Sequence, residues 1–457
     1  MLDTRLSALA SAALLLAFSL LTGCRRAPPD GVALLGATLF DGSGGPVLAN
    51  SAIVVRRGRI ESVGTRAGFE LPARTREVDV TGRWIIPGLI DVHAHVERWA
   101  LPRYLAWGVT TVRDLHGGLD SALRLRSRVN LGSVAGPRIY SAGAMIDGLP
   151  TTYPDAIGAS SPREARKAVD RLVNSGADLI KVYTRLDPSL LRAVVDEAHT
   201  FNLRVAAHLG MTDAVTAARE GVASIEHMSG VPEAALADPS SLYAAHYRGF
   251  FVGWTAFERS WSGLDSAALA RVAKALSERD VTLVPTLILH ETFSQLDDPA
   301  VLGDSMIGAA VPQLQQARWN VPDMIRRAGW TDEDYPAFRA ARPQQDRFLR
   351  MFFAAGGRIA TGTDASNQLL IPGYSEHREL QLLVGAGFSP RDALLAATRN
   401  GALALGVDSL GLIAPGKVAD LLVLTRDPLT DIRHTLAIDR VMSRGTLLSA
   451  DSIRKAW

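Results

Sequence analysis

The sequence predicts an α/β protein in which a TIM-like (β/α)8 barrel is joined to a small composite β-sandwich built from both chain ends. Eight short apolar runs with helix-like stretches between most of them occupy the centre of the chain, which is typical of buried parallel strands. Strand-like runs punctuated by turn residues occur at both ends. The 457 residues, 47% of them hydrophobic, are enough to build a large core.

The eight central runs are predicted to be the barrel strands. They occupy residues 89–95, 109–115, 138–145, 178–183, 204–209, 224–228, 281–287 and 358–364. The longest gaps, 229–280 and 288–357, follow late strands and should therefore extend loops at the active-site face. Both gaps contain tryptophans that would suit a lid or a pocket wall: Trp254, Trp261, Trp319 and Trp330.

The two ends of the chain share a pattern of short strand-like runs separated by turn residues. Residues 31–86 contain the turn Asp41–Pro46 and several apolar runs, and residues 409–457 contain two more such runs before Gly445. We expect these two segments to pair into one sandwich, with the barrel at 87–408 between them.

The first thirty residues predict export and a lipid anchor. An apolar run from Leu6 to Leu21 has the length of the core of a signal peptide and is short for a membrane-spanning helix. The following Leu21-Thr22-Gly23-Cys24 resembles the lipobox of bacterial lipoproteins, which implies a signal peptide at 1–23, lipidation of Cys24 and a tether at 24–30. By resemblance to the sorting rule of enteric bacteria, Arg25 after the cysteine implies a periplasm-facing lipoprotein of the outer membrane. An ordinary cleaved signal, or a misassigned start, remains the alternative.

Charge and cysteine content exclude several classes of protein. Lys and Arg total 49 against 47 Asp and Glu, a net charge of +2, which gives no general field for nucleic acid. A single cysteine excludes an intramolecular disulfide and a cysteine-cluster metal site. A metal ion would therefore need histidine and carboxylate ligands.

Candidate metal ligands fall at the ends of five predicted strands. His93 and His95 are two residues apart and so share one face of the first strand. An isolated His-x-His pair is a weak signal, but all the candidates fall where barrel active sites form, at the carboxyl ends of strands. The full set is His93, His95, Lys181, His208, His227 and Asp364. Lys181 is one of only five lysines in the chain and lies among apolar neighbours, where an unpaired cation is costly.

At this point the chain resembles the amidohydrolase superfamily, and most closely its imidazolonepropionase-like branch, which also contains dipeptidases acting on Xaa-Pro and Xaa-Arg/Lys bonds. The resemblance covers about residues 31–450. It is carried by the motifs Trp84–His95, Gly108–Asp114, Gly362-Thr363-Asp364, Ala397–Ala402 and Gly411–Leu421.

The resemblance implies a binuclear site and a role for each ligand. His93 and His95 would bind the more buried metal, and His208 and His227 the second. Lys181 would react with CO2 to form a carbamate (N6-carboxylysine) that bridges both ions. Asp364 would contact the first metal and shuttle a proton while a bridging hydroxide attacks the substrate. Imidazole and carboxylate ligands suit Zn2+ as the default ion, and Mn2+, Co2+ and Fe2+ fit the same set.

Three functions remain open from the sequence. The first is hydrolysis of an amide or peptide C–N bond in a small substrate or dipeptide. The second is a mononuclear cyclic-amide hydrolase or deaminase, although such relatives typically lack the strand-four lysine and carry His-x-x-Glu, whereas His208 is followed by Leu209-Gly210-Met211. The third is a non-catalytic, ligand-binding lipoprotein. The exact substrate and the oligomeric state are not encoded in any motif.

Further polar residues near the strand ends are secondary candidates. Tyr183 shares a face with Lys181 and is expected to contact substrate, as is His290 on the loop after the seventh strand. Arg113 is expected either to bind a substrate carboxylate or to form a salt bridge to Asp114 or another loop. Glu226 is expected to point away from His227 and to be structural. Of the other histidines, His246 is expected at the surface and His377 to be structural, while His116 follows the second strand with no partner evident from the sequence.

Overall fold

The computed structural model describes residues 30–302, 312–367 and 369–455. The predicted signal peptide, Cys24 and all of the tether except Asp30 lie outside the described residues. Within the described ranges, no helix combines the length and the apolar character needed to cross a bilayer.

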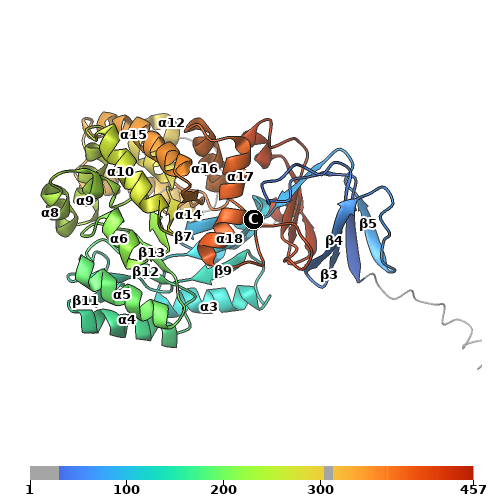
Figure 1. Cartoon of the computed structure of the whole chain (residues 1–457), viewed down its shortest axis with the longest axis horizontal. Coiled ribbons are helices and arrows are strands. Elements are labelled where there is room, and N and C mark those ends of the chain that lie inside the picture. The colour runs from blue at the N-terminus through green and yellow to red at the C-terminus, as the bar shows by residue number, and fades with distance from the viewer. Residues whose placement is uncertain (1–29, 303–311, 368, 456–457) are drawn as a thin grey trace, which may run out of the picture.

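A closed parallel barrel occupies the centre of the chain, which confirms the predicted fold class (Figure 1). Its strands are β7 (Leu89–Ala94), β8 (Val109–Asp114), β9 (Arg138–Ser141), β10 (Ile146–Gly148), β12 (Ile180–Val182), β13 (Val205–Ala207), β14 (Ser224–Glu226), β15 (Thr282–Val284) and β16 (Arg358–Ile359). Backbone hydrogen bonds close the ring: the N–H of Asp178 donates to Ser141, and that of Val92 to Thr361. The predicted strand 138–145 is divided into β9 and β10, and β11 (Ile157–Ala159) extends the sheet beside β10.

Helices cover the outside of the barrel between successive strands. They include α3 (Leu119–Asn130), α4 (Pro162–Asn174), α5 (Pro188–Thr200), α6 (Ala214–Glu220), α10 (Ser266–Ser277), α16 (Tyr374–Gly385), α17 (Pro390–Ala396) and α18 (Arg399–Leu405). The start of α4 shows why the sequence folds so: Ser161 accepts the N–H of Glu164, and Pro162 occupies the first turn, where no N–H is needed.

The two long segments after β14 and β15 fold into a helical layer over one side of the barrel. The first forms α7 (Val231–Ala235), α8 (Ser240–Arg248) and α9 (Phe250–Trp261) before α10, and the second forms α11 (Leu287–Ser294), α12 (Pro299–Leu302), α14 (Pro312–Ala328) and α15 (Asp334–Ala354). Trp254, Trp261 and Trp330 are buried inside this layer and do not face the cavity described below, and the side chain of Trp319 lies outside the described set. The expected wall exists, but phenylalanines form its surface.

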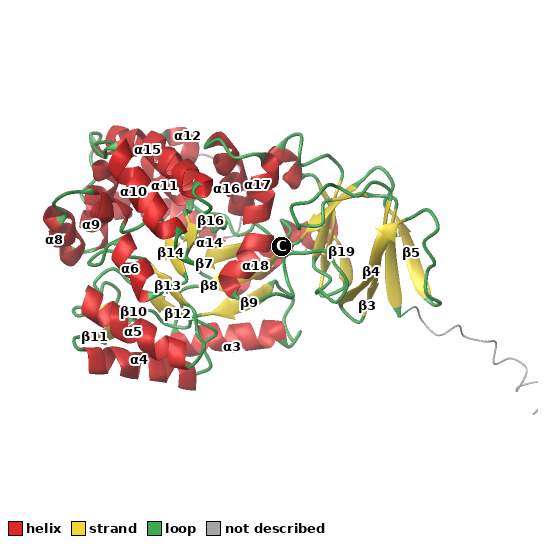
Figure 2. Cartoon of the chain, in the orientation of Figure 1, coloured by secondary structure: helices red, strands yellow, loops and turns green. Residues whose placement is uncertain are grey.

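A two-sheet sandwich stands beside the barrel (Figure 2). One sheet, in the order β4-β3-β1-β5, contains β1 (Gly31–Leu35), β3 (Ser51–Arg56), β4 (Arg59–Thr65) and β5 (Thr75–Asp79). The other, β19-β18-β17-β6-β2, combines β2 (Thr38–Leu39) and β6 (Trp84–Pro87) with β17 (Leu421–Leu424), β18 (Ile438–Ser443) and β19 (Thr446–Ser449). Because β6 pairs directly with β17, the two chain ends share one sheet, as predicted.

Candidate active site

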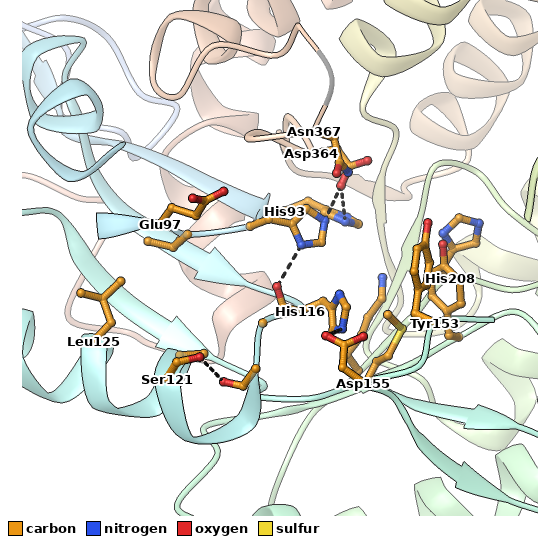
Figure 3. A pocket seen from close by; sticks show the side chains of 18 of the residues that line it. His93, Glu97, His116, Ser121, Leu125, Tyr153, Asp155, His208, Asp364 and Asn367 are labelled. Carbon is orange, nitrogen blue, oxygen red and sulfur yellow. Dashed lines mark hydrogen bonds and ion pairs between the residues drawn. The ribbon is translucent and has the colours of Figure 1, made fainter. Parts of the chain in front are cut away.

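A cavity of about 780 Å3 opens at the carboxyl ends of the barrel strands (Figure 3). All six residues predicted from the strand ends line it: His93, His95, Lys181, His208, His227 and Asp364. Five of them are buried, and His95 is partly exposed. The structure therefore brings together residues that are up to 271 positions apart in the chain (364 minus 93).

His93 and His95 converge on one carboxylate oxygen. Their Nε2 atoms lie 3.1 and 2.8 Å from Oδ1 of Asp364. Their Nδ1 atoms are engaged elsewhere, that of His93 by Glu226 at 2.8 Å and that of His95 by the carbonyl of His116 at 3.1 Å. Such contacts orient both rings with Nε2 toward the cavity, which is the arrangement of metal-binding histidines.

His227 completes a compact group of donors with His93 and Asp364. One ligand atom from each of the three lies within 4.8 Å of the others. His227 follows the end of β14 in the left-handed region, with φ of 59°, and Thr286 Oγ1 holds its Nδ1 at 2.7 Å. Asp364 also has a positive φ, of 62°. Non-glycine residues in this conformation are uncommon and tend to gather at functional sites.

His208 lies on the far side of His227, with 4.5 Å between the ring centroids. Burial lowers the pKa of both imidazoles well below the usual value, and the nearby Lys181 adds to this effect. Neutral imidazole is the form that binds a metal ion. Burial alone would raise the pKa of Asp364, but His93 and His95 outweigh it and hold that pKa well below its usual value.

Lys181 is 2% exposed, and its Nζ has no hydrogen-bond partner among the described residues. Burial lowers its pKa to about 8, although Glu226 and Asp364 oppose the shift. An uncharged amine at this position can react with CO2, and the product would be an anionic oxygen donor beside the histidines. The donor set therefore fits a divalent cation better than it fits an ammonium group.

A buried ion pair beneath the site corrects two expectations. Arg113 does not bind Asp114 or face the cavity: it donates to Glu226 at 2.8 Å and to Ser224 at 3.0 Å. Glu226 points into the barrel, on the same face as Ser224, and contacts His93. His227 nevertheless reaches the cavity, because its left-handed conformation breaks the alternation assumed for a regular strand. In the sequence, the one feature that could have indicated the partners of Arg113 is the Ser224-x-Glu226 spacing, which places both side chains on one face of the strand.

The secondary candidates divide into two groups. Tyr183 lines the cavity, with its ring 4.7 Å from that of His208, and His116 lines it too, with Nε2 3.1 Å from Asp155. His290 does not line it: the residue is buried, bonded through Nδ1 to Glu258 and stacked on Trp254 at 5.1 Å.

Two other histidines are buried. His246 was expected at the surface but is 6% exposed and bonded to Glu233 at 2.7 Å. His377 is structural, as expected, and bridges Thr435 and the carbonyl of Trp107.

Comparisons with known proteins agree with this geometry. The chain is 26% identical to the imidazolonepropionase of Deinococcus radiodurans over 423 aligned positions, which cover 85% of this chain and 89% of the relative. A structure described as a candidate prolidase from Bifidobacterium longum has a TM-score of 0.68 at 27% identity and covers 94% of this chain and 99% of its own. A Xaa-Pro dipeptidase with bound methionine shares the fold, with a TM-score of 0.67 at 23% identity over 92% of this chain and all of that one.

The model of the family described as "Amidohydrolase family" matches residues 84–448 of this chain. These residues include the whole barrel and all six residues of the candidate site. The resemblance drawn from the motifs is thereby confirmed. The chain belongs to the amidohydrolase family and is a metal-dependent hydrolase of carbon–nitrogen bonds.

Proposed function

We propose that this enzyme hydrolyses the amide or peptide bond of a small substrate, in the manner of a dipeptidase or prolidase, with two divalent metal ions held by His93, His95, His208, His227 and Asp364. Zn2+ is the default ion for this donor set. Lys181, as its carbamate, would contribute to both metal positions. The likeness to a structure described as a prolidase supports the substrate class.

The observation that carries the proposal is the isolated amine of Lys181. A buried lysine without a partner is costly, and here it lies in the same cavity as four histidines and an aspartate. Carbamate formation removes the cation and supplies oxygen donors, so it relieves the cost and completes the ligand set at once. A mononuclear site would leave the burial of this group unexplained.

The chain's own residues account for proton transfer. Bound divalent ions would supply electrophilic polarisation of a carbonyl and a more acidic water. Asp364, whose Oδ1 faces the cavity between His93 and His95, can accept a proton and return it to the departing nitrogen. Tyr183 is placed to donate a hydrogen bond to substrate, because its ring lies beside both Lys181 and His208.

The second candidate is a mononuclear cyclic-amide hydrolase, which the likeness to imidazolonepropionases favours. It differs in what it predicts for Lys181, since one ion would not need a carbamate.

We expect Lys181→Ala to lower the metal content from about two ions per chain to one or fewer and to reduce turnover at least a hundredfold. The measurement is metal analysis of protein prepared with bicarbonate and Zn2+, together with hydrolysis of a dipeptide and N-acyl amino acid panel. Added acetate or propionate should restore part of the lost metal binding, because a small carboxylate can occupy the space of the carbamate.

Lys274→Ala is the matched control, since this lysine is exposed on the outer helix α10. It should leave metal content and turnover unchanged. Equal metal content near one ion in the parent and in Lys181→Ala would reject the binuclear site and favour the mononuclear function. Stoichiometric ligand binding without turnover by the metal-loaded parent would favour a non-catalytic lipoprotein.

We also propose that Cys24 carries a lipid that anchors the enzyme to the bacterial envelope, facing the periplasm and most simply at the outer membrane. Expressed at full length in a bacterial host, the parent should fractionate with membranes, whereas Cys24→Ala should not. Arg26→Ala, a change in the tether, should keep the anchor. The mass of the N-terminal peptide checks the modification directly, and an unmodified Cys24 in membrane-free protein would refute it.

A further inference from the structure

One face of α3 forms part of the cavity wall. Ser121, Arg124, Leu125 and Arg128 recur at intervals of three and four positions, so they share one side of the helix, and all four line the cavity. Figure 3 shows Ser121 and Leu125 with Glu97 on one side of His93, and Tyr153 and His208 on the other. The cavity therefore extends from the candidate metal ligands toward α3.

Positive charge is in excess on the α3 side. Arg98 and Arg128 line the cavity, and neither guanidinium has a hydrogen-bond or ion-pair partner within the described part of the chain. Arg124 has only a long contact of 3.8 Å with Asp120, and both side chains are more than 70% exposed. Glu97 is the acidic lining residue on this side, and its carboxylate accepts the indole N–H of Trp99. These arginines are available to an incoming anion.

The other side of the cavity has a different chemical character. Aromatic and aliphatic side chains from the helical layer and from the β10–β11 loop line it: Tyr153, Phe250, Phe251, Leu289 and Phe293. Asp155 also lies there, paired with His116. The volume of about 780 Å3 lies in the upper part of the range for small-molecule sites, roughly 300–1,000 Å3. It is large enough for a small ligand that contacts both sides of the cavity.

We propose that Arg98 and Arg128 form an anion subsite that selects amides and peptides with a carboxylate on the α3 side and an apolar group against the aromatic wall. The assignment of the ligand as an amide rests on the proposed function. The subsite itself rests on the two unpaired guanidinium groups, which match carboxylate geometry with paired N–H donors. The same charges disfavour substrates that place a basic residue on this side.

A structural role is the competing explanation for Arg128, which lies in the last turn of α3, where a cation stabilises the helix end. A structural arginine would affect the unfolding midpoint but would not distinguish ligands by charge. The test therefore uses ligands that differ only in their carboxylates.

The experiment compares the dipeptides Phe-Glu, Phe-Gln and the carboxamide of Phe-Gln, which carry two, one and no carboxylates. Binding is measured by calorimetry on metal-loaded Asp364→Asn protein, which should retain ligand without rapid hydrolysis, and kcat/KM is measured on the parent. We expect affinity to fall about tenfold over the series. This dependence should disappear when Arg98→Gln and Arg128→Gln are combined, and Arg163→Gln, an exposed arginine of α4 outside the cavity, should preserve it.

Equal affinity for the three peptides, or a charge dependence that survives the double substitution, would overturn the subsite, and so would failure of all three to bind. Charge-dependent binding with no hydrolysis by the parent would support the subsite and count against the proposed dipeptidase activity. The two ideas can thus fail separately.

Discussion

Asp364→Asn should lower kcat/KM by about two to four orders of magnitude, the usual contribution of a positioned acid–base group. Asparagine keeps the size of the side chain and one oxygen that can face His93 and His95, but it cannot accept the proton that hydrolysis releases. The parent carboxylate is ionised throughout the neutral range, because its histidine contacts hold its pKa well below the usual value. The check is steady-state kinetics on the best substrate of the panel, with metal content measured in parallel.

Asp155→Asn is the matched control for that substitution. Asp155 lines the same cavity and contacts a histidine, but its side chain is 50% exposed, and among the described residues it belongs to no group of candidate metal ligands. We expect less than a tenfold effect on kcat for a ligand without charge on that side. An Asp364→Asn enzyme that keeps more than a tenth of parental kcat with full metal content would exclude Asp364 as the proton carrier.

Breaking the buried pair between Arg113 and Glu226 should produce the largest loss of stability. Both side chains are at most 1% exposed and lie 2.8 Å apart, so Arg113→Met leaves a buried carboxylate without its main partner. Such a change costs about 3–5 kcal/mol of unfolding free energy. Removing both charges, in Arg113→Met combined with Glu226→Gln, should cost less than Arg113→Met alone, because no unpaired charge remains. Denaturant unfolding of the metal-free single and double variants measures the coupling.

The exposed pair of Arg192 and Glu220 supplies the comparison. The two side chains approach to 2.7 Å, yet Arg192 is 63% exposed, so its loss should destabilise the fold far less than loss of Arg113. Additive losses for Arg113 and Glu226 would contradict the argument.

The buried pair also predicts acid sensitivity. Burial would raise the pKa of Glu226, but Arg113 and His93 lower it to about 2. A depressed pKa stabilises the fold above the ordinary value of 4.5, and this contribution is lost as the pH falls from there toward about 2.

The positions of the metal-ligand candidates were predictable because strand ends are the one part of a barrel whose location follows directly from local sequence. Each of His93, His208 and Asp364 closes an apolar run, and parallel strands bring such ends together. The direction of individual side chains was less accessible. Glu226 has the structural role expected for it, but its direction relative to His227 was wrong, because a strand alternates only while its backbone stays extended and His227 leaves that conformation.

The partners of buried polar groups in the helical layer were not predictable. His246 pairs with Glu233, and His290 with Glu258, through packing between helices that no short motif records. Arg113 likewise finds Glu226 across the barrel interior. By contrast, the composite sandwich was predictable from two similar β-rich ends. The pattern of short apolar runs and turns that marks a strand is local in the sequence, even though strand pairing is not.

The pairing of β6 with β17 means that this sheet can be completed only late in synthesis of the chain. Ile85 and Ile86 face Val423 and Leu422, so the ribosome must reach residue 424 before this edge of β6 has its neighbour. Until then β6 presents an unpaired apolar edge, which is a template for intermolecular association. If the chain crosses the membrane unfolded, β6 and β17 can pair only after both strands have reached the same side of the membrane. Shortening the chain before Leu421 should therefore yield aggregation instead of a smaller folded protein.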